Sequence, residues 1–309
     1  MRVYNHGLIL IALLLSGCAR DAQQPSLQTG SSHVLLTDGP FPYDRLARVD
    51  LYIVSVSASL STDTAAGAGG GFVTLVTPNR RFDVLALQNG ATAELGSLNL
   101  PTGAITAVRM VIDTDSSSIT LRDGRVLTGA NNGIHWQSSA GRPTLNALIH
   151  EQIAVPDTGA VIVIDYDLGR AFTSPQIQDS VTTDSSFTFM PQFRAVDATR
   201  TGTITGVVRA HAAGGAPVAD ASVQLYLGYP GTSENTWPGM ATGKTDATGT
   251  FRLSYVTRSA WWTGLPAWVG ATYIVAVDPP SGAGLGRTLV PNLSVAAAQV
   301  TSAGTIVLP

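Results

Sequence analysis

An all-β protein made of two β-sandwich domains is the fold that this sequence predicts. Short apolar stretches rich in Val, Ile and Thr end at Gly, Pro, Asn or Asp, and no stretch shows the periodicity of an amphipathic helix. Lys244 is the only lysine, and Glu94, Glu151 and Glu234 are the only glutamates among 21 acidic residues. Lys and Glu favour helix surfaces, whereas Asp favours turns. A GC-rich codon bias explains the excess of Arg over Lys equally well, but it explains the excess of Asp over Glu less well.

The overall composition excludes several other classes of protein. The chain has 309 residues, of which 44% are hydrophobic and 13% charged, with one Cys and a formal net charge of −3. One Cys cannot form a disulfide scaffold, and the apolar content is too high for a disordered chain. The slight negative charge predicts that no nucleic acid is bound. The length favours roughly two domains.

The N-terminus predicts a secretory signal. Arg2 precedes the apolar run of residues 8–15 (LILIALLL). As a helix this run spans about 12 Å, far less than the ~30 Å hydrocarbon core of a bilayer, so it is too short to cross a membrane.

The apolar run ends at residues 15–18 (LSGC), which resemble the cleavage box of bacterial lipoproteins. The resemblance implies that the signal peptide, residues 1–17, is removed and that Cys18 carries diacylglycerol and an amide-linked acyl chain such as palmitate. Membrane lipid is then a partner through the acylated Cys18, because several acyl chains anchor a protein firmly. The alternative is an ordinary secretory signal with a chance Cys.

The residue after Cys18 implies a location. Ala19 stands where lipoproteins of this kind carry Asp when they stay at the inner membrane, so the resemblance implies a cell-envelope protein of the bacterial outer membrane. The polar residues that follow lack periodicity, and we expect residues 18–32 to be a lipidated Cys and a flexible tether.

A first β-rich domain is predicted over residues 33–199. Its candidate strands are residues 49–60, 72–76, 106–112, 119–121 and 161–166. Asp123-Gly124 separates two of the apolar stretches and predicts a hairpin with a type I′ turn. Residues 82–87 fit either a short strand or a helical turn.

A second β-sandwich is predicted over residues 202–309. Its candidate strands are residues 204–208, 221–227, 242–253 (a strand, a turn and a strand), 273–277 and 304–308. Several short strands at this spacing, separated by turn residues, are typical of a sandwich.

Two resemblances support these domains. Residues 36–40 (LTDGP), 100–103 (LPTG) and 164–167 (IDYD) resemble a domain-of-unknown-function family found in bacterial surface lipoproteins, which usually has Ala where this chain has Gly39. Residues 206–208 (GVV), 215–221 (GAPVADA) and 245–251 (TDATGTF) are similar to carboxypeptidase regulatory-like, transthyretin-like modules. That similarity implies an immunoglobulin-like or prealbumin-like sandwich with a carbohydrate-binding-like fold, and it implies no peptidase activity.

The sequence predicts no enzymatic activity and no cofactor. No mature His has a Glu three residues on or a His four residues on, and there is no G-x-S-x-G. We expect His150 at a strand edge or in a loop. A hydrolase of unrecognised type is the alternative, and it requires His135 or His150 to converge with Asp and Arg side chains in a pocket of the first domain.

Asp165 and Asp167 are two residues apart at a predicted strand and therefore share a face. Two carboxylates this close attract either an arginine or a cation. We expect pairing with Arg109, Arg170 or another arginine, and no metal site; a calcium site at the two aspartates is the weaker alternative.

Aromatic residues provide the candidate ligand site. Two apparent insertions in the second domain, residues 228–241 and 257–272, contain Trp237, Trp261, Trp262, Trp268 and Tyr229. If exposed, these rings would stack on a sugar or an apolar partner. The alternative is that the tryptophans pack on one another or on the first domain.

These features predict a membrane-anchored cell-envelope lipoprotein that acts as a non-enzymatic binding or scaffold module. A polysaccharide or an envelope protein is the expected partner. The alternative is a structural lipoprotein that makes protein–protein contacts and binds no small ligand.

Overall fold

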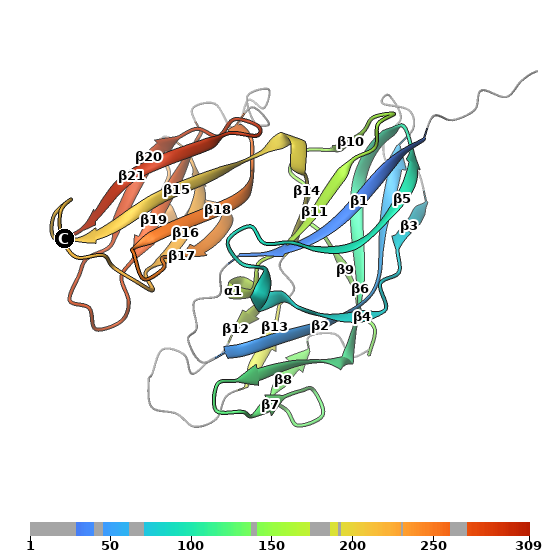
Figure 1. Cartoon of the computed structure of the whole chain (residues 1–309), viewed down its shortest axis with the longest axis horizontal. Coiled ribbons are helices and arrows are strands. Elements are labelled where there is room, and N and C mark those ends of the chain that lie inside the picture. The colour runs from blue at the N-terminus through green and yellow to red at the C-terminus, as the bar shows by residue number, and fades with distance from the viewer. Residues whose placement is uncertain are drawn as a thin grey trace, which may run out of the picture.

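The computed structural model describes residues 29–39, 46–61, 71–136, 141–173, 186–190, 193–229, 231–259 and 271–309. The predicted signal, Cys18 and residues 19–28 lie outside the described residues. So do Trp261, Trp262 and Trp268. Figure 1 shows two lobes of β-sheet side by side, which confirms the predicted all-β class.

Helical elements are short throughout the described chain. They are α1 (Leu168–Ala171) and the 3-10 turns η1 (Val84–Leu87), η2 (Ala198–Arg200) and η3 (Glu234–Thr236). None of the helices in the described part is both long and apolar enough to span a membrane.

Three sheets build the first lobe. The four-stranded sheet has the order β14 (Phe193–Asp197), β11 (Val161–Tyr166), β1 (Thr29–Asp38), β5 (Ala93–Pro101). The seven-stranded sheet runs β10 (Ile153–Val155), β6 (Gly103–Leu121), β2 (Leu46–Ser61), β3 (Phe72–Val76), with β4 (Arg80–Asp83) on β2 and with β7 (Val126–Leu127) and β9 (Thr144–Asn146) on β6. The small third sheet joins β12 (Phe172–Thr173), β13 (Phe187–Phe189) and β8 (Ile134–Trp136).

The long strands β2 and β6 carry much of the first core. The predicted strand over residues 49–60 is confirmed, and its alternate residues Val49, Leu51 and Ile53 are buried. The two stretches predicted over 106–112 and 119–121 are one strand, β6, whose pairing with β2 shifts register at four places. Residues 82–87 contain both a strand and a helical turn, because β4 ends at Asp83 and η1 follows it directly.

The hairpin predicted at Asp123-Gly124 joins β6 to β7, with Ile119 opposite Leu127. The predicted type I′ turn is wrong, because that turn needs two successive residues with positive φ and only Gly124, at 87°, has one in this loop. The loop closes instead with a bond from the Gly124 N–H to the Leu121 carbonyl, and with a second from the Leu121 N–H to the Arg125 carbonyl.

Strand β1 begins earlier than the sequence suggests. Residues 29–32, expected at the end of a tether, already pair with β5. Ser32 is fully buried, and its hydroxyl accepts a bond of 3.0 Å from the Ala160 N–H. The start of β1 could not be predicted from apolar alternation, because its first residues are small and polar.

The second lobe is a sandwich of two sheets. One has the order β18 (Thr250–Thr257), β15 (Thr201–Ala210), β21 (Val300–Leu308), and the other has the order β17 (Gly239–Lys244), β16 (Ser222–Gly228), β19 (Thr272–Asp278), β20 (Thr288–Leu293). Each predicted stretch of this domain corresponds to one or two of these strands, and β20 is additional. The buried residues of the second lobe form a hydrophobic core separate from that of the first lobe.

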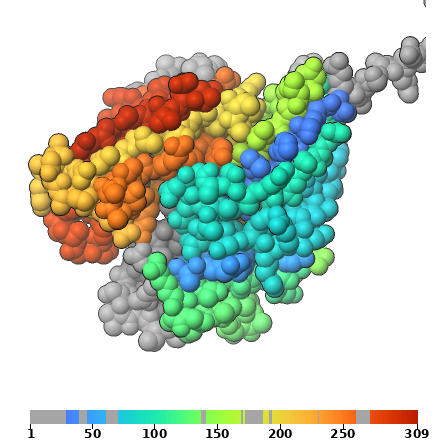
Figure 2. Space-filling model, viewed as in Figure 1, coloured from blue at the N-terminus to red at the C-terminus, as the bar shows by residue number. Residues whose placement is uncertain are grey.

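No flexible linker separates the lobes. β14 runs through η2 directly into β15, and the Asp197 carboxylate caps η2 by accepting a 2.9 Å bond from the Thr199 N–H. In Figure 2 the orange strands of the second lobe lie directly against the blue-green surface of the first. This junction places charged groups of both lobes next to one another.

Candidate functional site

The sequence LTDG at the end of β1 organises one side of the junction. Leu36 is fully buried in the first core. The Thr37 hydroxyl contacts the Ala91 carbonyl at 2.7 Å and the Leu87 carbonyl at 3.2 Å, while Asp38 Oδ1 accepts a 3.0 Å bond from the Leu168 N–H. Successive residues of one strand therefore fix two separate loops beside the second lobe.

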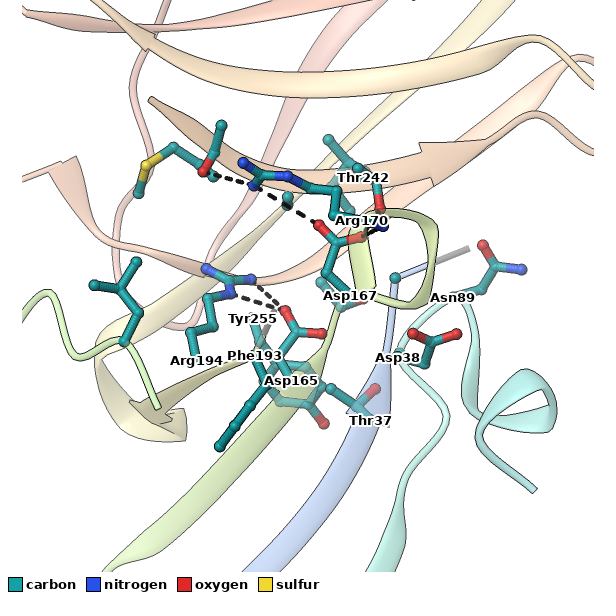
Figure 3. A pocket seen from close by; sticks show the side chains of 18 of the residues that line it. Thr37, Asp38, Asn89, Asp165, Asp167, Arg170, Phe193, Arg194, Thr242 and Tyr255 are labelled. Atoms are coloured by element: carbon teal, nitrogen blue, oxygen red, sulfur yellow. Dashed lines mark hydrogen bonds and ion pairs between the residues drawn. The ribbon is translucent and has the colours of Figure 1, made fainter. Parts of the chain in front are cut away.

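A cavity of about 60 Å³ lies at this junction, and segments of both lobes line it (Figure 3). Its ionisable lining is made of Asp38, His150, Asp165, Asp167, Arg170, Arg194, Arg252 and Tyr255. Eight ionisable side chains thus surround one small volume, and most of them need a partner of opposite charge or a hydrogen bond to be buried there.

Asp165 has the arginine partner that the sequence predicts, and that partner is Arg194. The two residues lie opposite each other on the neighbouring strands β11 and β14. Nε and Nη2 of Arg194 lie 2.9 and 2.6 Å from Oδ2 of Asp165, and both side chains are buried. Arg109, also considered as a partner, contacts Asn146 and the ring of Phe72 instead.

Asp167 joins the two lobes. Its Oδ1 accepts a 3.0 Å bond from the Thr242 hydroxyl of the second lobe, and its Oδ2 lies 3.9 Å from Nη1 of Arg170. Burial raises the pKa of Asp167 to about 6, although the charge of Arg170 opposes the rise. Asp165 adds to it by repulsion between like charges.

Two buried polar atoms at the cavity have no hydrogen-bond partner among the described residues. They are Oδ2 of Asp38 and Nη1 of Arg194, in side chains that are 4% and 6% exposed. Burial, together with repulsion by Asp165 and Asp167, raises the pKa of Asp38 well above its usual value. A polar cavity of this size has room for a few water molecules, which could pair with both groups.

His150 lines the same cavity, so His, Asp and Arg side chains converge here as the enzyme alternative requires. Burial and the charge of Arg194 lower the pKa of His150 to about 4, so its imidazole is neutral at pH 7. The cavity is lined by segments of both lobes, however, and does not lie within the first domain, where the enzyme alternative places its site. His135 lies on β8 and does not line the cavity. Across the described residues no three His, Cys, Asp or Glu side chains are grouped so as to hold a metal ion.

Beside the cavity, an open hollow of about 220 Å³ covers the outer face of β16 and β17. Arg170, Gly239 and Thr242 line both spaces. The rings of Tyr226 and Trp237 form one side of the hollow, with centroids 6.3 Å apart and planes tilted by 59°. The two rings thus make a corner rather than a flat stack.

Strand alternation explains which side chains reach the hollow. On β16, Val223, Leu225 and Leu227 point into the core, so Gln224 and Tyr226 point outward and bond to each other. The indole N–H of Trp237 donates a 2.8 Å bond to the Thr232 hydroxyl.

A glycine lets the Trp237 ring lie close to the sheet. A Cβ at Gly228 would come within 3.3 Å of the indole and 2.3 Å of the Ile274 side chain. A side chain at position 228 would therefore collide mainly with Ile274 and would press only slightly on the edge of the indole.

Of the aromatic residues proposed from the sequence, the structure places Trp237 in the hollow. Tyr229 is half-buried against the second core and is not among the residues that line the hollow, so its ligand contact stays a prediction. Tyr226 and Gln224 were missed, although the alternation of residues 221–227 places both on the outer face. Trp261, Trp262 and Trp268 lie outside the described residues.

A second ionic contact bridges the lobes on another side of the junction. Oε1 of Glu151 lies 2.6 Å from Nη1 of Arg200 and 2.5 Å from Nη2 of Arg258. Burial alone would raise the pKa of Glu151, but the hydrogen bonds from Arg258 and Arg200 outweigh it and lower the pKa. Arg200 directly precedes β15 and Arg258 directly follows β18, so Glu151 binds the end of this strand pair to the first lobe.

Fold and junction together define a two-sandwich β protein with an ionic cavity between its lobes and an aromatic hollow beside that cavity. Residues 29–187 match the domain of unknown function DUF4382, and the chain belongs to this family. The match confirms the resemblance of the first domain. The resemblance of residues 202–309 to carboxypeptidase regulatory-like modules stays a prediction.

Comparison with other proteins adds no function. No curated protein matches the chain. Similar solved structures include the minor pilin GBS52 of Streptococcus agalactiae, with a TM-score of 0.23, 10% identity and coverage of 90% of this chain and 95% of that one. The major pilin SpaA of Corynebacterium diphtheriae has a TM-score of 0.26, 10% identity and coverage of 90% and 99%. TM-scores this low carry no argument about fold or activity.

Proposed function

We propose that this protein is a lipid-anchored module of the bacterial cell envelope that binds carbohydrate and catalyses no reaction. The observation that carries the binding proposal is the corner formed by Trp237 and Tyr226, which opens beside polar side chains. Aromatic faces pack on the apolar faces of sugar rings, while hydroxyl and amide groups bond to sugar hydroxyls.

The anchoring part rests on Cys18 and the residues before it. A short apolar run followed by LSGC supports acylation of Cys18, and the Ala at position 19 supports delivery to the outer membrane. Acylation is tested in a Gram-negative host by labelling with an alkyne analogue of palmitate. The full chain should take up label and sediment with membranes, and Cys18→Ser should do neither. Equal labelling of the two chains would contradict the anchor.

The non-enzymatic part rests on how the charged groups of the cavity are used. Asp165 and Arg194 neutralise each other, Asp167 is bonded across the junction, and His150 is neutral at pH 7. Each of these groups is thus paired, bonded across the junction or uncharged, which supports a structural role for them.

Carbohydrate binding is tested with the detergent-solubilised full chain on an array of neutral and acidic oligosaccharides. We expect Trp237→Ala to weaken binding about tenfold, which corresponds to about 1.4 kcal/mol. Trp136→Phe, at an aromatic contact of the first lobe 4.7 Å from Phe189, is the matched control. Binding that Trp237→Ala leaves intact would remove the hollow as the site.

A structural module that contacts another envelope protein is the second candidate. The contacts between the lobes support it, because the ion pairs of Glu151 and the bond between Asp167 and Thr242 would hold the two lobes in a fixed relation. Absence of all binding on the array, with capture of a defined envelope protein by a surface cross-link, would favour it.

A further inference from the structure

We infer that the hollow takes an acidic saccharide of the uronate class, whose carboxylate binds Arg170; this inference rests on the proposed carbohydrate-binding function. Arg170 belongs to α1 of the first lobe, whereas the other described residues that line the hollow belong to the second. The site is therefore composite and complete only when the lobes are joined.

Arg170 is the only charged group among the described residues that line the hollow. The next basic and acidic groups of the second lobe are paired with each other: Lys244 with Asp220, and Arg287 with both Glu234 and Asp278. A ligand in the hollow thus meets the guanidinium of Arg170, which lies 3.9 Å from Asp167, against a polar and aromatic background, and this arrangement complements a single carboxylate.

The guanidinium of Arg170 is held in place but keeps donors available. Its Nη1 donates a 3.0 Å bond to the Gly239 carbonyl, and its side chain is 43% exposed. Asp167 lies 3.9 Å away, too far for a close bidentate pair. Figure 3 shows the side chain of Arg170 beside Asp167 and Thr242. Arg170 lines both the cavity and the hollow. Its remaining N–H groups make no hydrogen bond with the described residues, so they can reach a carboxylate.

Gly239 sets the position of this guanidinium. A Cβ at residue 239 would lie 2.8 Å from Nη1 and 2.9 Å from Cζ of Arg170. The arginine head thus lies flat on the β17 backbone. Because the obstructed atoms are the far end of a flexible side chain, Gly239→Ala should displace Arg170 without unfolding the sandwich.

The rest of the hollow suits the remainder of a sugar residue. Trp237 and Tyr226 offer two faces in a corner, and Gln224, Ser222 and Thr242 line it with groups that can bond to hydroxyls. Stacking together with a fixed positive charge selects a sugar ring that bears a carboxylate over a neutral sugar.

The test compares oligogalacturonate with the same oligomer after methyl esterification, which removes the charge and keeps the sugar ring. Binding to the full chain in detergent is measured by calorimetry at low salt. We expect the free acid to bind at least tenfold more tightly than the ester, since hydrogen bonds to charged groups contribute more than neutral ones. Raising the salt concentration should reduce this difference.

Four variants locate the effect. Arg170→Gln and Gly239→Ala should abolish the preference, so that each variant binds the acid no more tightly than it binds the ester. Trp237→Ala should weaken both. Arg125→Gln, at an arginine of similar exposure in the β6–β7 loop, should change neither. Urea unfolding of each variant checks that the fold is kept.

The outcomes separate the two proposals. Equal binding of acid and ester, still dependent on Trp237, would overturn the acidic ligand and leave carbohydrate binding standing. A preference for the acid that survives Arg170→Gln would overturn the role of Arg170. If neither oligomer binds and the array is blank, both proposals fall.

Discussion

The backbone of Gly39 lies so close to Thr242 that a Cβ at position 39 would come within 2.8 Å of the Thr242 hydroxyl oxygen. Gly39 follows β1 in the first lobe, and Thr242 is on β17 in the second. The same hydroxyl donates to Asp167, so the contact and the hydrogen bond are parts of one junction. The Ala that the resemblance leads one to expect at position 39 would meet the second lobe, which gives this departure a physical reason.

Gly39→Ala should therefore loosen the junction. The new methyl group forces Thr242 to move and weakens its bond to Asp167, and we expect a loss of about 1–3 kcal/mol in the free energy of unfolding by urea. Gly214→Ala is the matched control, because a Cβ there meets no atom within 4 Å. In a Thr242→Ala background the cost of Gly39→Ala should fall, as a double-mutant cycle would show. Additive costs would mean that this contact is not the cause.

Glu151→Gln should destabilise the protein, since it leaves Arg200 and Arg258 without their shared carboxylate. The side chain of Glu151 is 18% exposed and those of its partners 37% and 34%, so we expect a loss of about 2 kcal/mol, less than for a fully buried pair. Because the pKa of Glu151 is lowered on folding, its contribution is complete above the usual Glu pKa and is lost as the pH falls through the lowered value. The gap between wild type and variant, measured in urea, should close in acid. A gap that stays constant down to pH 2 would contradict this.

The contribution of Asp167 to stability should depend on pH in the opposite direction, and Asp167→Asn should remove it. The pKa of Asp167 is raised to about 6 on folding, so its buried ionised form is disfavoured. The wild-type protein should thus lose stability as the pH rises from about 4 to about 6, by on the order of 3 kcal/mol, and Asp167→Asn should remove that loss. Asn keeps an acceptor for Thr242. The measurement is the urea midpoint at several pH values, and an unchanged pH profile would refute the assignment.

Ala19→Asp should redirect the protein within the envelope. If residue 19 acts as the lipoprotein resemblance implies, the variant should move from the outer-membrane to the inner-membrane fraction while Cys18 is still acylated. Density-gradient fractionation with palmitate labelling measures both. Ala19→Ser is the control and should stay with the outer membrane; identical distributions of all three chains would exclude this sorting.

Several local features could be predicted from the sequence because they depend on alternation along one strand. The strand predicted over residues 161–166 matches β11, and an arginine partner for Asp165 followed from two carboxylates on one face. The identity of that partner could not follow, because Arg194 reaches Asp165 only through the pairing of β11 with β14.

The contacts between the two lobes could not be predicted from local sequence patterns. Asp38 stands in a motif that the sequence displays, but it is buried and bonded to the N–H of Leu168, which lies 130 residues further along the chain. The parallel pairing of β1 with β11 likewise joins segments more than 120 residues apart. Tyr226 is different, because alternation already placed it outward, and only its neighbour Trp237 had to come from the fold.

Strand β1 has a mechanical consequence. It begins at Thr29 and ends at Asp38, next to the contact of Gly39 with the second lobe, having run roughly 33 Å between β11 and β5 (Figure 1). Tension applied to the chain before Thr29 acts along the strand, so the hydrogen bonds on both of its edges are loaded in shear and share the force. The protein should withstand a pull at its N-terminal end without first separating its lobes.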